Sequence, residues 1–181
     1  MEFDAVSTDQ LKELALFEKS LGHGKFAGVF ASDTLPKSPS GNGSRGYIVN
    51  TDPHHRPGRH WIALWTEDET CQVMDSYGLP LASHRTPHLQ VWLRKHYKIT
   101  EANTQSLQAY NSSTCGHYAL KFLIDRSQGK TFSDFLDQFS PFDYVYNDAM
   151  IARWMTHKML KYRPPIHYKE EFIYPHSSDE E

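Results

Sequence analysis

The chain has 181 residues, of which 39% are hydrophobic and 23% are charged, a composition that is ordinary for a globular domain. Its 19 Lys and Arg and 22 Asp and Glu residues give a formal net charge of -3, which excludes a strong general attraction for polyanions. Two cysteines cannot build a disulfide framework, and no apolar run approaches the roughly 18 residues of a membrane span. We therefore expect one domain over residues 1–168 in an intracellular reducing compartment, and a polar, flexible tail over residues 169–181.

The first elements that the chain predicts are a helix, a loop and a strand. Residues 7–21 indicate an amphipathic helix, because Ser7 and Gln10 have the spacing of a capping box and leucines recur on one face. Residues 32–46 are rich in Ser, Pro and Gly, which predicts an exposed loop. The core sheet is expected to begin with residues 47–50.

Two apolar segments in the middle of the chain predict an antiparallel hairpin. Residues 60–66 and residues 70–75 flank the short polar turn Glu67–Glu69. The two ends of such a hairpin lie side by side. We therefore expect His60 and Asp75 to meet, although fifteen positions separate them in the sequence.

The second half of the chain is mainly helical in pattern. Thr86 and Pro87 have the character of a helix cap and a first helical residue. The remaining predicted elements are a short strand over 106–109, a buried helix over 115–126, and helices over 131–139 and 149–160. Together these elements predict an α+β fold with a central, mostly antiparallel sheet packed by helices.

The most informative residue for chemistry is Cys115, which follows small polar residues at the start of a predicted helix. A free cysteine has a pKa of about 8.5, and a helix N-terminus or a nearby imidazolium lowers that value and yields the nucleophilic thiolate. His60 could act as the base and Asp75 could orient its imidazole. Gln108, seven positions before Cys115, could stabilise an oxyanion together with the Cys115 backbone amide. This set predicts a cysteine hydrolase.

Simpler interpretations apply to several of these residues. A lone cysteine is usually an apolar core residue, and this interpretation is favoured for Cys71 in its predicted strand. The neighbours His54 and His55 lie in a polar loop, where solvation is favoured over metal binding. Trp61 could be a core residue. No zinc-ligand spacing is present, so no metal site is expected.

Three sequence blocks resemble the adenovirus maturation protease family, adenain, in the clan of the SUMO-specific proteases. The blocks are Arg59–Trp61, Thr70–Gly78 and Ser106–Gly116, and the resemblance covers roughly residues 7–127. It implies the α+β cysteine peptidase fold of that clan and an endopeptidase that cuts next to glycine.

The resemblance also implies a role for each residue of the site. His60 would be the base, Asp75 the orienting carboxylate, Gln108 the oxyanion donor and Cys115 the nucleophile. Trp61 would bind substrate by covering a narrow channel that admits glycine residues, since members of the clan cut after Gly-Gly or Gly-X sequences.

The chain differs from the family in two respects. Adenain has glutamate where Asp75 stands, whereas the SUMO-protease branch has aspartate. Adenain also forms a disulfide with an activating peptide, but no cysteine lies near the matching position, Tyr97. Activation through a disulfide-bound peptide is therefore not expected. The activators that the resemblance still implies are a noncovalently bound peptide and DNA. Basic residues that could bind DNA phosphates, although solvated helix faces are the favoured interpretation, are Arg94, Lys95, Arg153, Lys158, Lys161 and Arg163.

These patterns predict a monomeric cysteine endopeptidase that cleaves viral precursor or structural proteins at Gly-containing sites, without a required cofactor. A viral enzyme of this kind would act in the host nucleus or in the virion. An isopeptidase that removes SUMO or ubiquitin-like proteins is the alternative, which the aspartate and Trp61 favour. A binding module with a relict site is a third interpretation.

Overall fold

The computed structural model describes residues 4–39 and 43–162. The predicted tail over 169–181 lies outside these residues. The helices are α1 (Thr8–Phe17), α2 (Pro87–His96), α3 (Cys115–Ser127), α4 (Phe132–Leu136) and α5 (Tyr144–Lys161), with short 3-10 turns η1 (Lys19–Leu21) and η2 (Leu81–His84). The strands are β1 (Phe26–Ala31), β2 (Arg45–Asn50), β3 (Trp61–Glu67), β4 (Thr70–Met74) and β5 (Ile99–Ala102).

The five strands form one mixed sheet in the order β1-β2-β3-β4-β5. The central strand β3 pairs antiparallel with β2 and with β4, whereas β1 runs parallel to β2 and β5 runs parallel to β4. The predicted α+β architecture with a central sheet is confirmed. The antiparallel character holds for the centre of the sheet and not for its two outer pairings.

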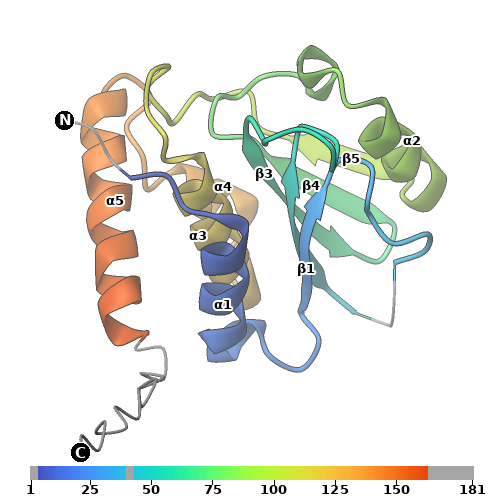
Figure 1. Cartoon of the computed structure of the whole chain (residues 1–181), viewed down its shortest axis with the longest axis horizontal. Coiled ribbons are helices and arrows are strands. Elements are labelled where there is room, and N and C mark those ends of the chain that lie inside the picture. The colour runs from blue at the N-terminus through green and yellow to red at the C-terminus, as the bar shows by residue number, and fades with distance from the viewer. Residues whose placement is uncertain (1–3, 40–42, 163–181) are drawn as a thin grey trace, which may run out of the picture.

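Helices cover both faces of the sheet (Figure 1). The group α1, α3, α4 and α5 lies on one face, and α2 lies on the other. A hydrophobic core lies on each face of the sheet, and alternate side chains of β3 point into one or the other. Ala63 and Trp65 pack with the larger helical group, and Ile62 and Leu64 pack toward α2. Burial on both faces explains why residues 60–66 read as a continuous apolar run.

Several predicted elements are confirmed in place. Ser7 and Gln10 form a capping box at the start of α1, with the Gln10 backbone N–H donating to Ser7 Oγ at 3.2 Å. The predicted hairpin is β3 and β4, with Thr66 opposite Cys71. The helix predicted to begin at Cys115 is α3.

The sequence pattern missed the two outer strands. β1 carries a register shift at Gly28, where the backbone has φ 141°, and this irregularity interrupts any alternating pattern. All four residues of β5 are exposed, so this edge strand has no apolar face to recognise. The sheet therefore begins at Phe26 rather than at Tyr47.

Other boundaries differ from the prediction. Residues 106–109 form no strand; the backbone N–H groups of Leu107 and Gln108 both donate to the Ser76 carbonyl, which makes this segment a loop across the end of β4. Thr86 precedes Pro87 as predicted, but its hydroxyl makes no capping hydrogen bond. The predicted helix over 149–160 extends from Tyr144 to Lys161 as α5, and the one over 131–139 is shortened to α4.

None of the helices in residues 4–39 and 43–162 is long and apolar enough to cross a membrane.

Candidate active site

The hairpin places His60 and Asp75 together beyond the ends of β3 and β4, in the interior of the sheet order. His60 directly precedes β3, Asp75 directly follows β4, and the His60 Nε2 lies 2.7 Å from the Asp75 Oδ1. Both side chains are only 4% exposed. The backbone of Asp75 is fixed by Asn103, whose side-chain oxygen accepts from the Asp75 N–H and whose side-chain nitrogen donates to the Asp75 carbonyl. The predicted meeting of these two residues is confirmed.

The Asp75 carboxylate accepts hydrogen bonds on both of its oxygens. Its Oδ1 accepts from His60 and from the Tyr77 backbone N–H at 2.9 Å. Its Oδ2 contacts the His84 Nε2 at 2.6 Å and accepts from the Leu79 backbone N–H at 3.2 Å. Four partners hold this buried carboxylate, which fixes its orientation and favours its ionised form.

Burial and hydrogen bonding shift the pKa values of this pair in opposite directions. Burial raises the pKa of Asp75, but the hydrogen bonds from His60 and His84 outweigh it and hold the pKa well below the usual range. Burial lowers the pKa of His60, but hydrogen bonds to Asp75 and Cys115 raise it to about 9. His60 is therefore cationic at neutral pH, beside an ionised carboxylate.

Cys115 is half-buried, opens α3 and lies close enough to the His60 imidazole to help raise its pKa. Because Nε2 of His60 is engaged with Asp75, the other ring nitrogen is the one left for the thiol. The helix N-terminus adds a partial positive charge at the sulfur. The structure thus brings Cys115, His60 and Asp75 together in one chain of interactions.

Gly116 allows α3 to begin against the start of β3. A Cβ atom at this position would lie 2.4 Å from Val6 Cγ2 and 3.2 Å from Trp61 Cδ1. Trp61 is half-buried and packs with the residues of the larger core. This close approach keeps the half-buried Cys115 next to the His60–Trp61 segment.

Gln108 is 2% exposed and lies between the end of β4 and the start of α3. Its Oε1 accepts from Ser76 Oγ at 2.6 Å. Its Nε2 donates to the carbonyl and the hydroxyl of Ser112, at 2.9 and 3.0 Å. The side-chain amide is therefore held in one orientation, with its N–H groups toward the segment that precedes Cys115.

Asp148 is a buried residue of the site that sequence reasoning missed. From α5 it accepts hydrogen bonds from Thr114 Oγ1 at 2.7 Å, from the Tyr118 hydroxyl at 3.1 Å and from the Ala109 N–H at 3.0 Å. It ties the loop before Cys115 to a helix that is distant in sequence. Nothing in the local pattern around Asp148 indicates this role, because every partner belongs to another element.

Two aromatic rings that sequence reasoning did not place also stack on His60. The Tyr77 ring centroid lies 4.7 Å away at an interplanar angle of 29°, and the His84 centroid lies 5.3 Å away at 20°. Burial and nearby negative groups raise the pKa of Tyr77 to about 12, so this ring stays neutral. One of eleven histidines in the chain, His84 carries no sequence signal that would single it out.

Trp61 borders a surface cavity of about 300 Å³. The cavity is also lined by residues of β1, by Thr8 at the start of α1, by Asn50 and by the loop with Arg56 and Gly58. It adjoins the segment that carries His60.

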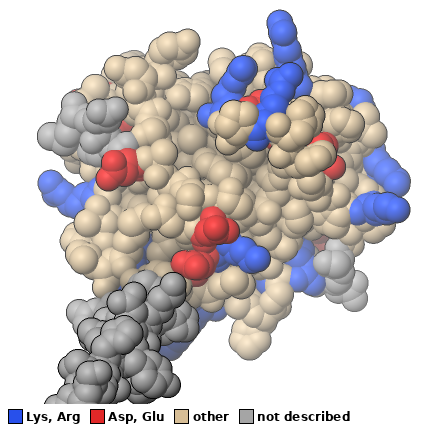
Figure 2. Space-filling model, viewed as in Figure 1, with Lys and Arg blue, Asp and Glu red and all other residues tan. Residues whose placement is uncertain are grey.

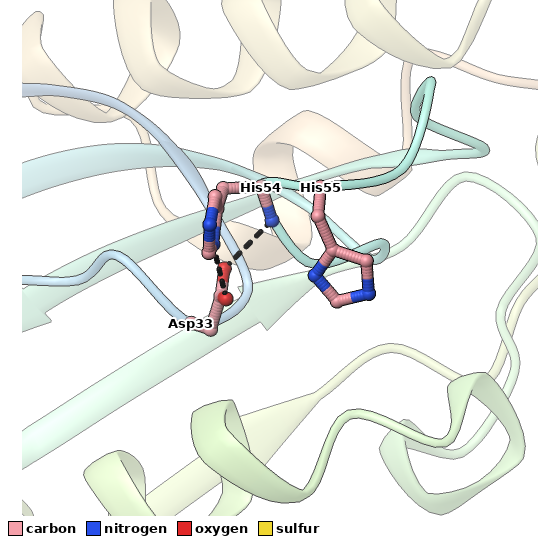
Figure 3. A group of neighbouring side chains, drawn as sticks. All are labelled: Asp33, His54 and His55. Atoms are coloured by element: carbon pink, nitrogen blue, oxygen red, sulfur yellow. Dashed lines mark hydrogen bonds and ion pairs between the residues drawn. The ribbon is translucent and has the colours of Figure 1, made fainter.

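The loop between β2 and β3 is tied to the end of β1 by Asp33, as Figure 3 shows. The Asp33 carboxylate accepts from the His54 backbone N–H at 2.8 Å and contacts its Nδ1 at 2.7 Å. The His54 side chain is 67% exposed, as expected for a solvated histidine. Candidate ligand atoms of Asp33, His54 and His55 lie within 4.8 Å of one another, which is close enough to hold a metal ion. The hydrogen bonds already account for how Asp33 and His54 are arranged.

Cys71 and Lys158 have contacts of their own. Cys71 is completely buried in β4, and burial raises the pKa of its thiol, as expected for an unreactive core cysteine. Lys158 forms an ion pair with Glu18. On the face shown in Figure 2, Lys and Arg side chains lie in separate groups with Asp and Glu side chains among them. Arg163 lies outside the described residues.

The chain matches no protein-family model and none of the curated proteins. Several solved structures are similar to it, among them a protease and a bacterial effector protein. The ASFV pS273R protease is 21% identical with a TM-score of 0.42, over 63% of this chain and 43% of that one. The effector protein RavZ of Legionella pneumophila is 11% identical with a TM-score of 0.30, over 92% of this chain and 57% of that one.

The chain thus covers about half the length of these two structures. At such identities and TM-scores, neither likeness establishes a family or a function for it.

Proposed function

We propose that the protein is a cysteine endopeptidase with Cys115 as nucleophile, His60 as general base and acid, and Asp75 as the carboxylate that orients the imidazole. The observation that supports this proposal most directly is the buried chain of contacts from Asp75 through His60 to the half-buried Cys115. A cationic imidazole beside a thiol at a helix N-terminus is the arrangement that stabilises a thiolate.

The reaction would begin with attack of the Cys115 thiolate on the carbonyl carbon of the scissile peptide bond. His60 would then donate its proton to the leaving amine, which departs as the C–N bond breaks and a thioester remains on Cys115. In the second half, His60 would take a proton from water, the hydroxide would attack the thioester, and the carboxylic acid product would leave. Asp75 stays ionised throughout and stabilises the imidazolium.

The negative oxygen that forms in each half needs donors about 2.7–3.1 Å away. We assign this role to the backbone N–H of Cys115 and to the side-chain amide of Gln108. The hydrogen bond from the Ser76 hydroxyl to Oε1 supports the assignment of Gln108, because it orients the N–H groups of this side chain toward the segment that precedes Cys115. Substrate binding would have to exchange one contact between Gln108 and Ser112 for the oxyanion.

Trp61 is the residue that we propose to select glycine at the cleavage site. Its ring packs on the backbone of Gly116, next to the nucleophile, and it borders the cavity of about 300 Å³. A bulky indole beside the scissile bond restricts the space for side chains there. We propose precursor or structural proteins of a virus, or of a virus-derived mobile element, as substrates cut at Gly-containing sites.

The test is to incubate the wild type and Cys115→Ala with candidate capsid precursors and with a peptide library derived from a proteome. We expect cleavage next to glycine by the wild type only, identified by mass spectrometry of the new termini. Cys71→Ala is the matched control, because that thiol is buried in β4, and it should cleave like the wild type. Equal cleavage by the wild type and Cys115→Ala would remove the proposal.

An isopeptidase acting on SUMO or ubiquitin-like conjugates is the second candidate function. The aspartate in the triad and the position of Trp61 over Gly116 favour it. Vinyl-sulfone probes built on these modifiers separate the two functions. Covalent labelling of Cys115 by such a probe would favour the isopeptidase, and cleavage of precursors without any labelling would favour the endopeptidase.

The remaining proposals concern the oligomeric state, the cellular location and the activators of the enzyme. We propose that the enzyme acts as a monomer in a reducing compartment, with the host nucleus or the virion as its site if it is viral. Repeating the cleavage assay with added DNA or with candidate activating peptides tests whether either one is an activator.

A further inference from the structure

His84 touches the same carboxylate as His60 but comes from a different part of the chain. Its Nε2 lies 2.6 Å from the Asp75 Oδ2, whereas His60 Nε2 lies 2.7 Å from Oδ1. The His84 side chain is only 9% exposed. Each of the two imidazoles therefore takes one oxygen of a single buried carboxylate.

A short 3-10 turn fixes the backbone of His84. His84 is the last residue of η2, which begins after Pro80, and Leu81 packs against the core beneath α2. Arg85 ends the turn in the left-handed conformation, with φ 51°, and its N–H donates to the Ala82 carbonyl. A tight turn with a non-glycine residue at positive φ holds His84 over the end of β4.

His84 also contacts the His60 ring directly. The two rings are stacked at 5.3 Å with an interplanar angle of 20°. The stacking and the contact with Oδ2 hold His84, Asp75 and His60 in one arrangement, in which Oδ1 faces His60.

We propose that His84 is a positioning residue, which holds the second oxygen of Asp75 so that the first oxygen stays on His60. The inference rests on the proposed function, because it concerns the placement of the imidazole of that same site. His84 contacts both Asp75 and His60. Tyr77 stacks on His60, stays neutral and donates its backbone N–H to Asp75, and Arg85 next in sequence is exposed.

Three variants test the positioning role. His84→Gln keeps an N–H at the place of Nε2, and His84→Ala removes it. His88→Gln is the matched control, because His88 is an exposed histidine nearby on α2.

The first measurement is an NMR titration of the His60 imidazole, which needs no substrate. In the wild type we expect the raised pKa of His60 that its contact with Asp75 produces. The pKa of His60 should fall in His84→Ala, which frees the carboxylate, and should stay at the wild-type value in His84→Gln and in His88→Gln. A His60 titration curve that is the same in the wild type and in His84→Ala would overturn the inference.

The second measurement is peptide cleavage by the same variants at neutral pH. His84→Ala should lose roughly 10- to 100-fold in kcat with KM within about twofold, the size expected for a lost hydrogen bond to a charged group. His84→Gln should recover kcat to within roughly threefold of the wild type. Equal loss of kcat in both variants, or a change in KM alone, would contradict the positioning role.

The two measurements also separate this inference from the proposed function. If neither the wild type nor any variant cleaves a peptide, the proposed function fails, and the NMR titration still decides whether His84 couples to His60.

Discussion

At the scale of single residues, the proposed chemistry depends on the orientation of the His60 imidazole by the Asp75 carboxylate. All the hydrogen bonds to the Asp75 side chain come from N–H donors, so an amide in its place would turn its own N–H group toward one of them. We expect Asp75→Asn to keep the fold and to lower turnover roughly 10³–10⁴-fold, because His60 loses its tautomer and orientation. Steady-state kinetics measure the turnover, and thermal unfolding measures the stability of the fold. A turnover near that of the wild type would mean that Asp75 has only a structural role in the turn after β4.

Gln108 provides a second prediction at this scale. If its amide donates to the oxyanion, Gln108→Ala should reduce turnover by roughly 10²–10³ with substrate affinity little changed. Ser76→Ala is the control, because it removes only the hydroxyl that orients the amide, and it should cost much less. A rise in KM without a fall in kcat would instead assign Gln108 to ground-state binding.

At the scale of elements, the fit of α3 against β3 depends on a glycine inside a helix. Replacing glycine by alanine in a helix usually stabilises it by about 1 kcal/mol. In Gly116→Ala, however, the new methyl would lie 2.4 Å from Val6 Cγ2, and we expect a net destabilisation of about 1–3 kcal/mol from overpacking. Chemical denaturation of the variant measures this loss.

The control for this prediction is a second substitution that restores the space. Val6→Ala in the Gly116→Ala background should recover part of the free energy of unfolding, because the clashing methyl group is removed. A Gly116→Ala protein more stable than the wild type would show that α3 can shift away from the start of β3.

The elements that the sequence predicted are those with local signals. The capping box at Ser7, the polar turn between β3 and β4, and the small polar residues before Cys115 each lie within a few positions of the structure that they specify. The sequence did not predict β1 or β5. In β1 a register shift between Phe26 and Gly28 interrupts the alternation of apolar and polar residues, and in β5 all four residues are exposed, so no such alternation exists.

The candidate site follows the same rule. His60, Asp75, Gln108 and Cys115 could be proposed because they stand at the ends of recognisable elements or in spaced blocks. His84 meets the same carboxylate through a turn stabilised by Arg85, and no pattern in the sequence encodes that meeting. Asp148, likewise, reaches the nucleophile loop only because α5 packs beside it.

At the scale of the whole molecule, two buried histidines make stability depend on pH in opposite directions. The pKa of His60 is raised to about 9, so its contribution is present below about pH 6.5, its unfolded value, and is lost as pH rises through 9. Burial lowers the pKa of His117 to about 4, and its Nδ1 has no hydrogen-bond partner among the described residues. Stability is therefore lost as pH falls from about 6.5 through 4.

We expect a maximum in the free energy of unfolding near pH 6.5, with each histidine contributing on the order of 3 kcal/mol to the fall on its own side. His60→Gln should reduce the loss of unfolding free energy above pH 6.5. His117→Leu should reduce the loss below pH 6.5. Denaturation at pH 4.5, 6.5 and 9 measures both, and unchanged slopes in the variants would mean that other groups govern the dependence.

The most direct measurement of the central claim, a reactive thiol paired with an imidazole, is the rate at which iodoacetamide alkylates Cys115 at pH 6.5. Mass spectrometry distinguishes Cys115 from Cys71, which serves as the buried internal reference. The account predicts that Cys115 reacts much faster than glutathione in the wild type and loses that advantage in His60→Ala. If Cys115 reacts no faster than glutathione, or reacts equally fast without His60, the assignment of this site as a cysteine peptidase is contradicted.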